Sequence, residues 1–172
     1  MTHAKEQTLR GNLPVIRIVL MLFCLLCTTP AHADVLDGPC QRYSVPKVLA
    51  LAIMKQESDG NPWCVNVEGR DFHARSKEEA LDVIRRNSNR SYDVGLMQVN
   101  SWWLRHLGIT PEAAIDPANN VQLGLWILAS EIRRHGLSWK AVGAYHSPNP
   151  IRQASYARLI ARHLRNIMNH EK

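Results

Sequence analysis

Glu57 is the strongest candidate for a catalytic residue in this chain, because it follows closely on an apolar segment that runs from Val48 to Met54. On a helix, the residues three and four positions before Glu57 are Met54 and Ile53, so its carboxyl projects from a face that packs into the protein. Burial raises the pKa of a carboxyl towards neutrality, which suits a group that first donates a proton and then takes one back. The spacing therefore predicts a general acid; the alternative is a solvated carboxylate at a frayed helix end.

Glycoside hydrolysis usually needs a second carboxylate, which acts as nucleophile or activates water. Asp59 lies two residues beyond Glu57 and points elsewhere, while Asp71, Asp93 and Asp116 stand in turn or cap settings. The sequence therefore offers no evident second carboxylate.

Four blocks follow one another along the chain: ESDGNPW at 57–63, GLMQVN at 95–100, NVQLG at 120–124 and AVGAYH at 141–146. Together they resemble the lysozyme-like lytic transglycosylase (SLT) domain of bacteria, which cleaves the glycan strands of peptidoglycan. The resemblance extends over residues 43–168. It implies a mainly α, lysozyme-like α+β fold, a compact helical domain with a small β-hairpin beside the active-site cleft.

The resemblance makes Glu57 the catalytic residue. It implies that this glutamate protonates the glycosidic oxygen between N-acetylmuramic acid and N-acetylglucosamine. The glutamate then deprotonates the muramyl C6 hydroxyl, whose attack on C1 gives a 1,6-anhydro end, with the substrate's acetamido group in place of the missing carboxylate. Two alternatives remain open: a water-using muramidase, which needs Asp71 or Asp93 near Glu57, and a catalytically silent peptidoglycan-binding scaffold of a secretion complex.

The resemblance also assigns residues to substrate binding: Ser58, Gly95, Met97, Gln98, Asn100 and Tyr145. It implies that Ser58 positions the acetamido or C6 group, although a helix-end hydrogen bond would explain this serine equally well. Gly95 would permit close backbone approach, Met97 would line an apolar wall or else the core, and Gln98 would bind sugar. The hydroxyl of Tyr145 would hold the catalytic glutamate.

Two departures from the commonest family pattern point to a specialised role. His146, Ser147 and Pro148 follow Tyr145 where many members have Asn-Ala-Gly, and the stretch from Val67 to Tyr92 is long. Both features resemble members associated with conjugation and secretion machines, which open gaps in the cell wall. The resemblance therefore implies subunits of such machinery as partners, beside the glycan strands.

The amino-terminal residues have the three parts of a secretory signal peptide: a basic start, an apolar run from Ile18 to Cys27, and the small-residue site Ala31-His32-Ala33. An apolar run of about ten residues is too short for a stable membrane span, which needs about twenty. We therefore expect a signal peptide at 1–33, one domain at 34–172 and a periplasmic location, with an uncleaved anchor as the alternative.

Cys40 and Cys64 would remain after cleavage, and two cysteines in an exported domain most simply form one disulfide. A closed loop of about 25 residues would contribute about 3 kcal/mol. The alternative is a nucleophilic Cys64 with His146 as its partner.

The net charge of +6 suits an anionic polymer such as peptidoglycan. Nucleic acid is not expected, because the arginines of the last helix fall mostly on its solvent face and no reading module is present. The apolar stripe of that helix is Tyr156, Leu159, Ile160, Leu164 and Ile167. The histidines form no metal spacing, so we expect no metal and no cofactor.

The remaining patterns predict helices at 46–57, 76–86, 97–108 and 116–135, with a hairpin at 63–74. Gly124 lies on the core stripe of the longest helix and would let another helix approach closely. One of Trp102 and Trp103 could stack on a sugar ring while the other packs inward, although core packing is the default for both.

Overall fold

The computed structural model describes residues 35–170, without the side chain of His170. The predicted signal peptide, with Cys24 and Cys27, lies outside this range. Within it, no helix has the length and apolar character needed to cross a membrane.

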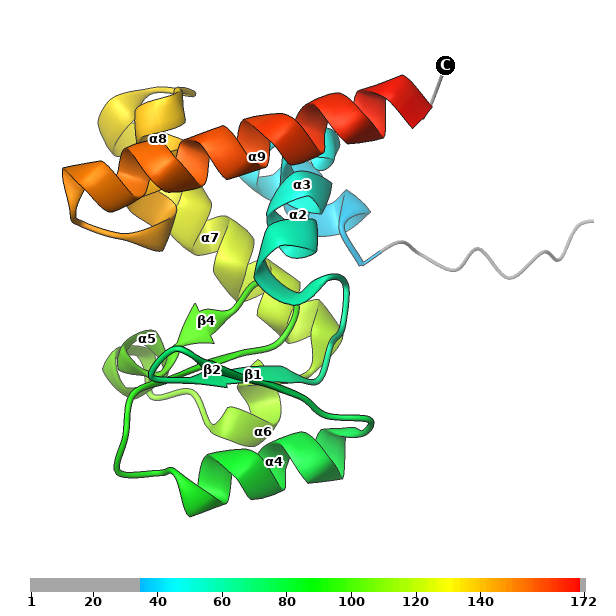
Figure 1. Ribbon diagram of the computed structural model, residues 1–172, viewed down its shortest axis with the longest axis vertical. Coiled ribbons are helices and arrows are strands. Elements are labelled where there is room, and N and C mark those ends of the chain that lie inside the picture. The colour runs from blue at the N-terminus through cyan, green and yellow to red at the C-terminus, as the bar shows by residue number, and fades with distance from the viewer. Residues whose placement is uncertain (1–34, 171–172) are drawn as a thin grey trace, which may run out of the picture. The chain divides into compact units, whose positions relative to one another are not determined.

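Five helices form one part of the domain (Figure 1): α2 (Asp37–Tyr43), α3 (Lys47–Ser58), α7 (Pro117–His135), α8 (Trp139–His146) and α9 (Pro150–His170). Helix α9 packs across both α3 and α8, and α8 also packs against α7. Helix α7 begins where predicted, because the side chain of Asp116 accepts a hydrogen bond from the amide of Asn119 (3.2 Å) and Pro117 starts the first turn.

The other part holds a four-stranded antiparallel sheet in the order β2-β1-β3-β4, together with helices α4, α5 and α6. Its elements are β1 (Cys64–Val67), β2 (Arg70–His73), α4 (Lys77–Arg86), β3 (Tyr92–Val94), β4 (Val99–Asn100), α5 (Ser101–Leu107) and α6 (Pro111–Ala114). The predicted hairpin is β1 with β2, and the predicted helix from residue 76 is α4, whose N-cap Ser76 accepts from the amide of Glu79 (3.2 Å). The mainly α, lysozyme-like fold class is therefore confirmed.

The prediction of a helix from Met97 to Gly108 was wrong over its first turn. Helix α5 begins only at Ser101, and the preceding residues form the β3–β4 turn. Gly95 and Gln98 have left-handed backbone angles, with φ of 78° and 44°, which no helix can continue through. Asn100 then caps α5 by accepting from the amide of Trp102 (2.8 Å).

Gly124 lies on the buried face of α7, but its neighbour is a side chain and not the expected helix. A Cβ atom at Gly124 would lie 2.4 Å from the Cβ of Met97, whose side chain is fully buried. The glycine therefore makes room for Met97, and this contact joins α7 to the turn between β3 and β4.

The structure does not show the predicted disulfide between Cys40 and Cys64, so this bond stays a prediction. Cys40 lies in α2, which packs against α7 and α3, whereas Cys64 is a free thiol in β1 between two other strands. The alternative of a nucleophilic Cys64 is also disfavoured, because burial raises its thiol pKa to about 11 and leaves little thiolate at neutral pH.

Candidate active site

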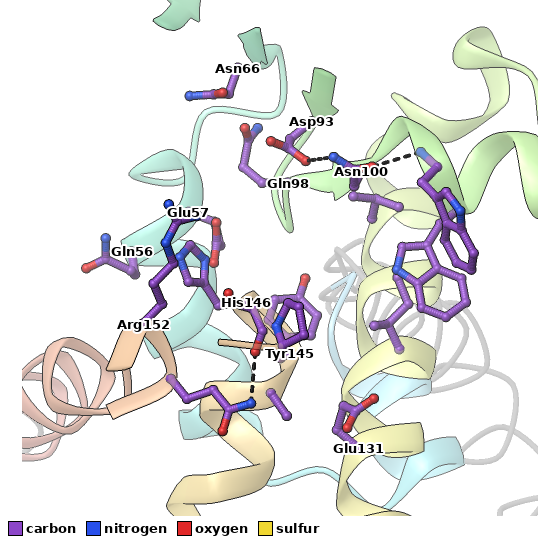
Figure 2. A pocket seen from close by; sticks show the side chains of 18 of the residues that line it. Gln56, Glu57, Asn66, Asp93, Gln98, Asn100, Glu131, Tyr145, His146 and Arg152 are labelled. Carbon is purple, nitrogen blue, oxygen red and sulfur yellow. Dashed lines mark hydrogen bonds between the residues drawn. The ribbon is translucent and has the colours of Figure 1, made fainter. Parts of the chain in front are cut away.

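Glu57 lies in the last turn of α3 and lines a cleft of about 1150 Å³ between the helical part and the sheet (Figure 2). Helix α3 ends one residue later, at Ser58, because Asp59 has a left-handed backbone (φ 54°) and Gly60 follows. The glutamate is therefore presented at the carboxyl end of the helix.

The Glu57 carboxyl accepts a hydrogen bond from the hydroxyl of Tyr156 on α9, with 2.5 Å between the two oxygens. The sequence analysis assigned this role to Tyr145, and that assignment was wrong: the Tyr145 hydroxyl donates to the backbone oxygen of Met97 (2.5 Å). Tyr156 was recognised only as part of an apolar stripe. A tyrosine on a buried stripe needs a partner for its hydroxyl, and this was the signal that could have identified it.

Burial raises the pKa of Glu57 from its ordinary value of 4.5 to about 7. The hydrogen bond from Tyr156 acts in the opposite direction, and the charges of Asp93 and Asp71 add smaller upward contributions. A carboxyl with this pKa is protonated in about half of the molecules at neutral pH, as a general acid requires.

One wall of the cleft is a row of polar side chains, one from each strand of the sheet. Asn66 on β1 lies opposite both Asp71 on β2 and Asp93 on β3, and Asp93 lies opposite Asn100 on β4. Directly opposed residues share a face, so all four point to the same side of the sheet. The amide of Asn66 donates to Asp71 (2.6 Å), and that of Asn100 donates to Asp93 (2.7 Å). This row was not predicted, because the pairing of β1 with β3 cannot be read from local spacing.

Asp93 is the more enclosed of the two aspartates on this wall. Burial raises its pKa, while the hydrogen bond from Asn100 acts to lower it. Both aspartates line the same cleft as Glu57, although the sequence placed them in turn or cap settings.

Of the predicted substrate-binding residues, Gln98, Asn100 and Tyr145 line the cleft. The side-chain nitrogen of Gln98 donates to the backbone oxygens of Cys64 (3.1 Å) and Gly95 (2.9 Å). Only its side-chain oxygen is therefore left to accept from a sugar hydroxyl.

Three of the predicted substrate-binding residues do not line the cleft but lie behind the residues that do: Ser58, Gly95 and Met97. The buried Ser58 hydroxyl lies 3.0 Å from the backbone oxygen of Leu96, so it ties the end of α3 to the β3–β4 turn. A Cβ at Gly95 would lie 2.5 Å from the side chain of Asn120, and Met97 is fully buried. In this structure the three residues hold the β3–β4 turn and the end of α3 in place, and their assignment to substrate binding stays a prediction.

Asn120 on α7 is the buried polar residue that fixes this turn. Its side chain accepts from the amide of Met97 (2.8 Å) and donates to the backbone oxygens of Val94 and Ala114 (both 2.9 Å). The block at 120–124 thus holds the cleft in shape without touching it.

The two tryptophans differ in exposure. Both line the cleft, but Trp102 is 52% exposed and stacks on His106, whereas Trp103 is half-buried and packs edge-on against Trp126. Trp102 is therefore the more accessible of the two for stacking on a sugar ring.

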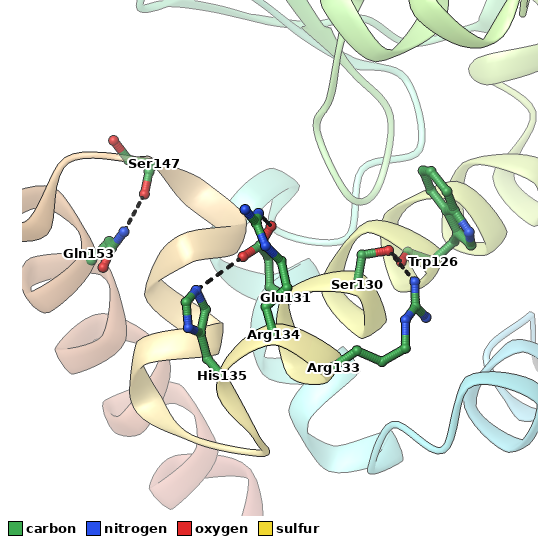
Figure 3. Close-up of polar contacts among 8 residues, drawn as sticks. All are labelled: Trp126, Ser130, Glu131, Arg133, Arg134, His135, Ser147 and Gln153. Carbon is green, nitrogen blue, oxygen red and sulfur yellow. Dashed lines mark hydrogen bonds and ion pairs between the residues drawn. The ribbon is translucent and has the colours of Figure 1, made fainter.

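The far end of the cleft carries charged groups from α7 and α9 that the sequence analysis did not single out. Glu131 forms an ion pair with Arg134 (3.1 Å) and lies 3.6 Å from a ring nitrogen of His135, as Figure 3 shows, and Arg152 lines the cleft beside His146. No cluster of three or more histidine, cysteine, aspartate or glutamate side chains that could hold a metal occurs among residues 35–170.

A helical domain with a small sheet, and a cleft that presents a carboxylic acid with a pKa near 7, define a lysozyme-like enzyme that acts on glycosidic bonds. A model of the transglycosylase SLT domain family matches residues 35–155. The chain belongs to this family and is a peptidoglycan lytic transglycosylase.

Similar proteins include protein IpgF of Shigella sonnei, which is 33% identical over 132 residues, or 73% of this chain and 74% of that protein. Invasion protein IagB of Salmonella typhi is 35% identical over 89 residues, covering 48% of this chain and 56% of that protein. Protein virB1 of Agrobacterium fabrum is 35% identical over 95 residues, covering 53% of this chain and 38% of that protein.

Proposed function

We propose that this enzyme cleaves the β-1,4 bond between N-acetylmuramic acid and N-acetylglucosamine and leaves 1,6-anhydromuramyl ends. Glu57 donates a proton to the leaving glycosidic oxygen. It then accepts the proton of the muramyl C6 hydroxyl while the C6 oxygen attacks C1. The observation that carries this proposal is the raised pKa of Glu57, about 7, because one group must exist in both protonation states during each turnover. The cleft volume of about 1150 Å³ exceeds the range of about 300–1,000 Å³ usual for small-molecule pockets and suits a polymer.

The remaining cleft residues supply the binding groups for the glycan. Gln98 offers its side-chain oxygen to a sugar hydroxyl, and Trp102 offers a ring face to a pyranose. The Asn100 side chain donates to Asp93 and accepts from the amide of Trp102 at the start of α5. It therefore contributes mainly by holding Asp93 in position.

A hydrolytic muramidase is the second candidate, because Asp71 and Asp93 share the cleft with Glu57. Their charges raise the pKa of Glu57, so both lie within electrostatic reach of it. Either could activate a water or stabilise positive charge at C1.

The test is to digest purified peptidoglycan with the protein and to identify the ends of the products by mass spectrometry. Anhydromuramyl ends that disappear in Glu57→Gln support the proposed reaction. Reducing ends that disappear in Asp93→Asn or Asp71→Asn instead identify a hydrolase. A wild-type protein that binds peptidoglycan but releases no product is a scaffold.

We further propose that the enzyme is exported to the periplasm and opens the wall locally for a conjugation or secretion apparatus. The support is the sequence pattern at residues 1–33 and the long stretch from Val67 to Tyr92, which supplies strand β2 of the cleft-lining sheet and helix α4. Fractionation of cells that express a tagged chain, followed by amino-terminal sequencing, tests export and cleavage after Ala33.

A further inference from the structure

His146 is a cleft residue to which the proposed reaction gives no role. It ends α8, directly after Tyr145, and its ring lies flat against the ring of Tyr156, with 4.5 Å between centroids and an angle of 1° between planes. Tyr156 is only 3% exposed and donates the hydrogen bond to Glu57. His146 therefore covers the face of the residue that holds the general acid.

We propose that His146 is a positioning residue: its stacked ring fixes the Tyr156 phenol where the hydroxyl donates to Glu57, and it keeps cleft water away from that bond. The proposal rests on the proposed role of Glu57. Stacked aromatic pairs contribute more than their buried area alone, and a phenol covered on one face has fewer orientations to adopt. The hydrogen bond to Glu57 is directional, so small rotations of this ring would weaken it.

The surroundings of His146 favour its neutral form. Burial and the nearby charge of Arg152 both lower its pKa (Figure 2). A cationic ring beside Tyr156 would favour the ionised form of Glu57 and remove the proton that the acid must donate. A neutral ring provides the stacking surface without this cost, and Arg152 helps to keep it neutral.

The experiment measures kcat and KM on peptidoglycan for four variants of the full chain. These are His146→Ala, His146→Phe, Tyr156→Phe and the double variant that combines Tyr156→Phe with His146→Ala. Removing a hydrogen bond of ordinary strength lowers a rate about tenfold, so we expect kcat of His146→Ala to fall about tenfold with KM changed less than about twofold. His146→Phe keeps the stacking ring and should retain most of kcat. In the Tyr156→Phe background, His146→Ala should have no further effect.

Three outcomes overturn the proposal. If His146→Phe loses as much activity as His146→Ala, the ring nitrogens act on substrate. If His146→Ala lowers kcat by the same factor in the Tyr156→Phe background as in the wild type, the histidine does not act through the tyrosine. If neither His146→Ala nor His146→Phe changes kcat, the histidine does not position the acid.

A second readout separates this proposal from the proposed function. The ring-proton NMR signals of Tyr156 should shift in His146→Ala and stay near their wild-type positions in His146→Phe, whether or not peptidoglycan is cleaved. Unchanged signals in His146→Ala would refute the stacking, whereas full activity in Glu57→Gln would refute the role of Glu57.

Discussion

Glu57→Gln should make the folded protein more stable at alkaline pH while it removes activity. The wild-type carboxyl has a pKa of about 7 in the folded protein and 4.5 as its ordinary value, which we take for the unfolded chain. Between these values the unfolded chain loses its proton first, so wild-type stability falls as pH rises from about 4.5 to 7 and then stays low. Glutamine has a similar shape and does not ionise, so the variant avoids this loss.

The magnitude follows from the two pKa values. A tenfold change in an ionisation constant corresponds to about 1.4 kcal/mol, so the full effect above pH 7 is at most about 3–4 kcal/mol. Because Glu57 faces an open cleft, water reduces this figure, and we expect the variant to gain about 1–2 kcal/mol over the wild type between pH 5 and pH 8.

Urea denaturation of the two proteins at pH 5, 6, 7 and 8 measures this difference. The matched control is Glu112→Gln, because Glu112 is exposed at the start of α6 and does not line the cleft. A difference between Glu57→Gln and wild type that is the same at all four pH values would refute the raised pKa of Glu57.

Three further outcomes are expected. Peptidoglycan cleavage should decline as pH rises above about 7, because the general acid loses its proton there; a rate that keeps rising to pH 9 would contradict this. Gly124→Ala should destabilise the protein by about 2 kcal/mol in urea, since the new methyl group would overlap Met97, whereas Gly38→Ala on α2 meets no atom within 4 Å and should be neutral or slightly stabilising. Tyr145→Phe should cost about 1 kcal/mol of stability by removing the bond to Met97 while leaving the pH dependence of cleavage unchanged; a shifted pH profile would restore this tyrosine as the partner of Glu57.

The sequence by itself determined helices α3, α4 and α7 and the position of the acid. Local signals were sufficient for this: Pro46 before α3, the Ser76 cap of α4, and Asp116 with Pro117 at the start of α7. The burial of Glu57 also followed from local spacing, because Met54 and Ile53 lie on the same helical face. These features depend on residues a few positions apart, and such contacts can be read from a linear pattern.

Tertiary structure decided which side chains reach Glu57. Tyr156 lies 99 positions from Glu57 and meets it only because α9 crosses α3, while Tyr145, which fitted the family pattern, points to Met97 instead. Asp71 and Asp93 reach the cleft because β1 pairs with both β2 and β3, a register that local spacing does not fix. Ser58, Gly95 and Met97 matched a site motif, yet packing of α3 and α7 against the β3–β4 turn gives them structural roles. A motif fixes residue types and spacing, whereas the packing of distant elements decides which of them face the substrate.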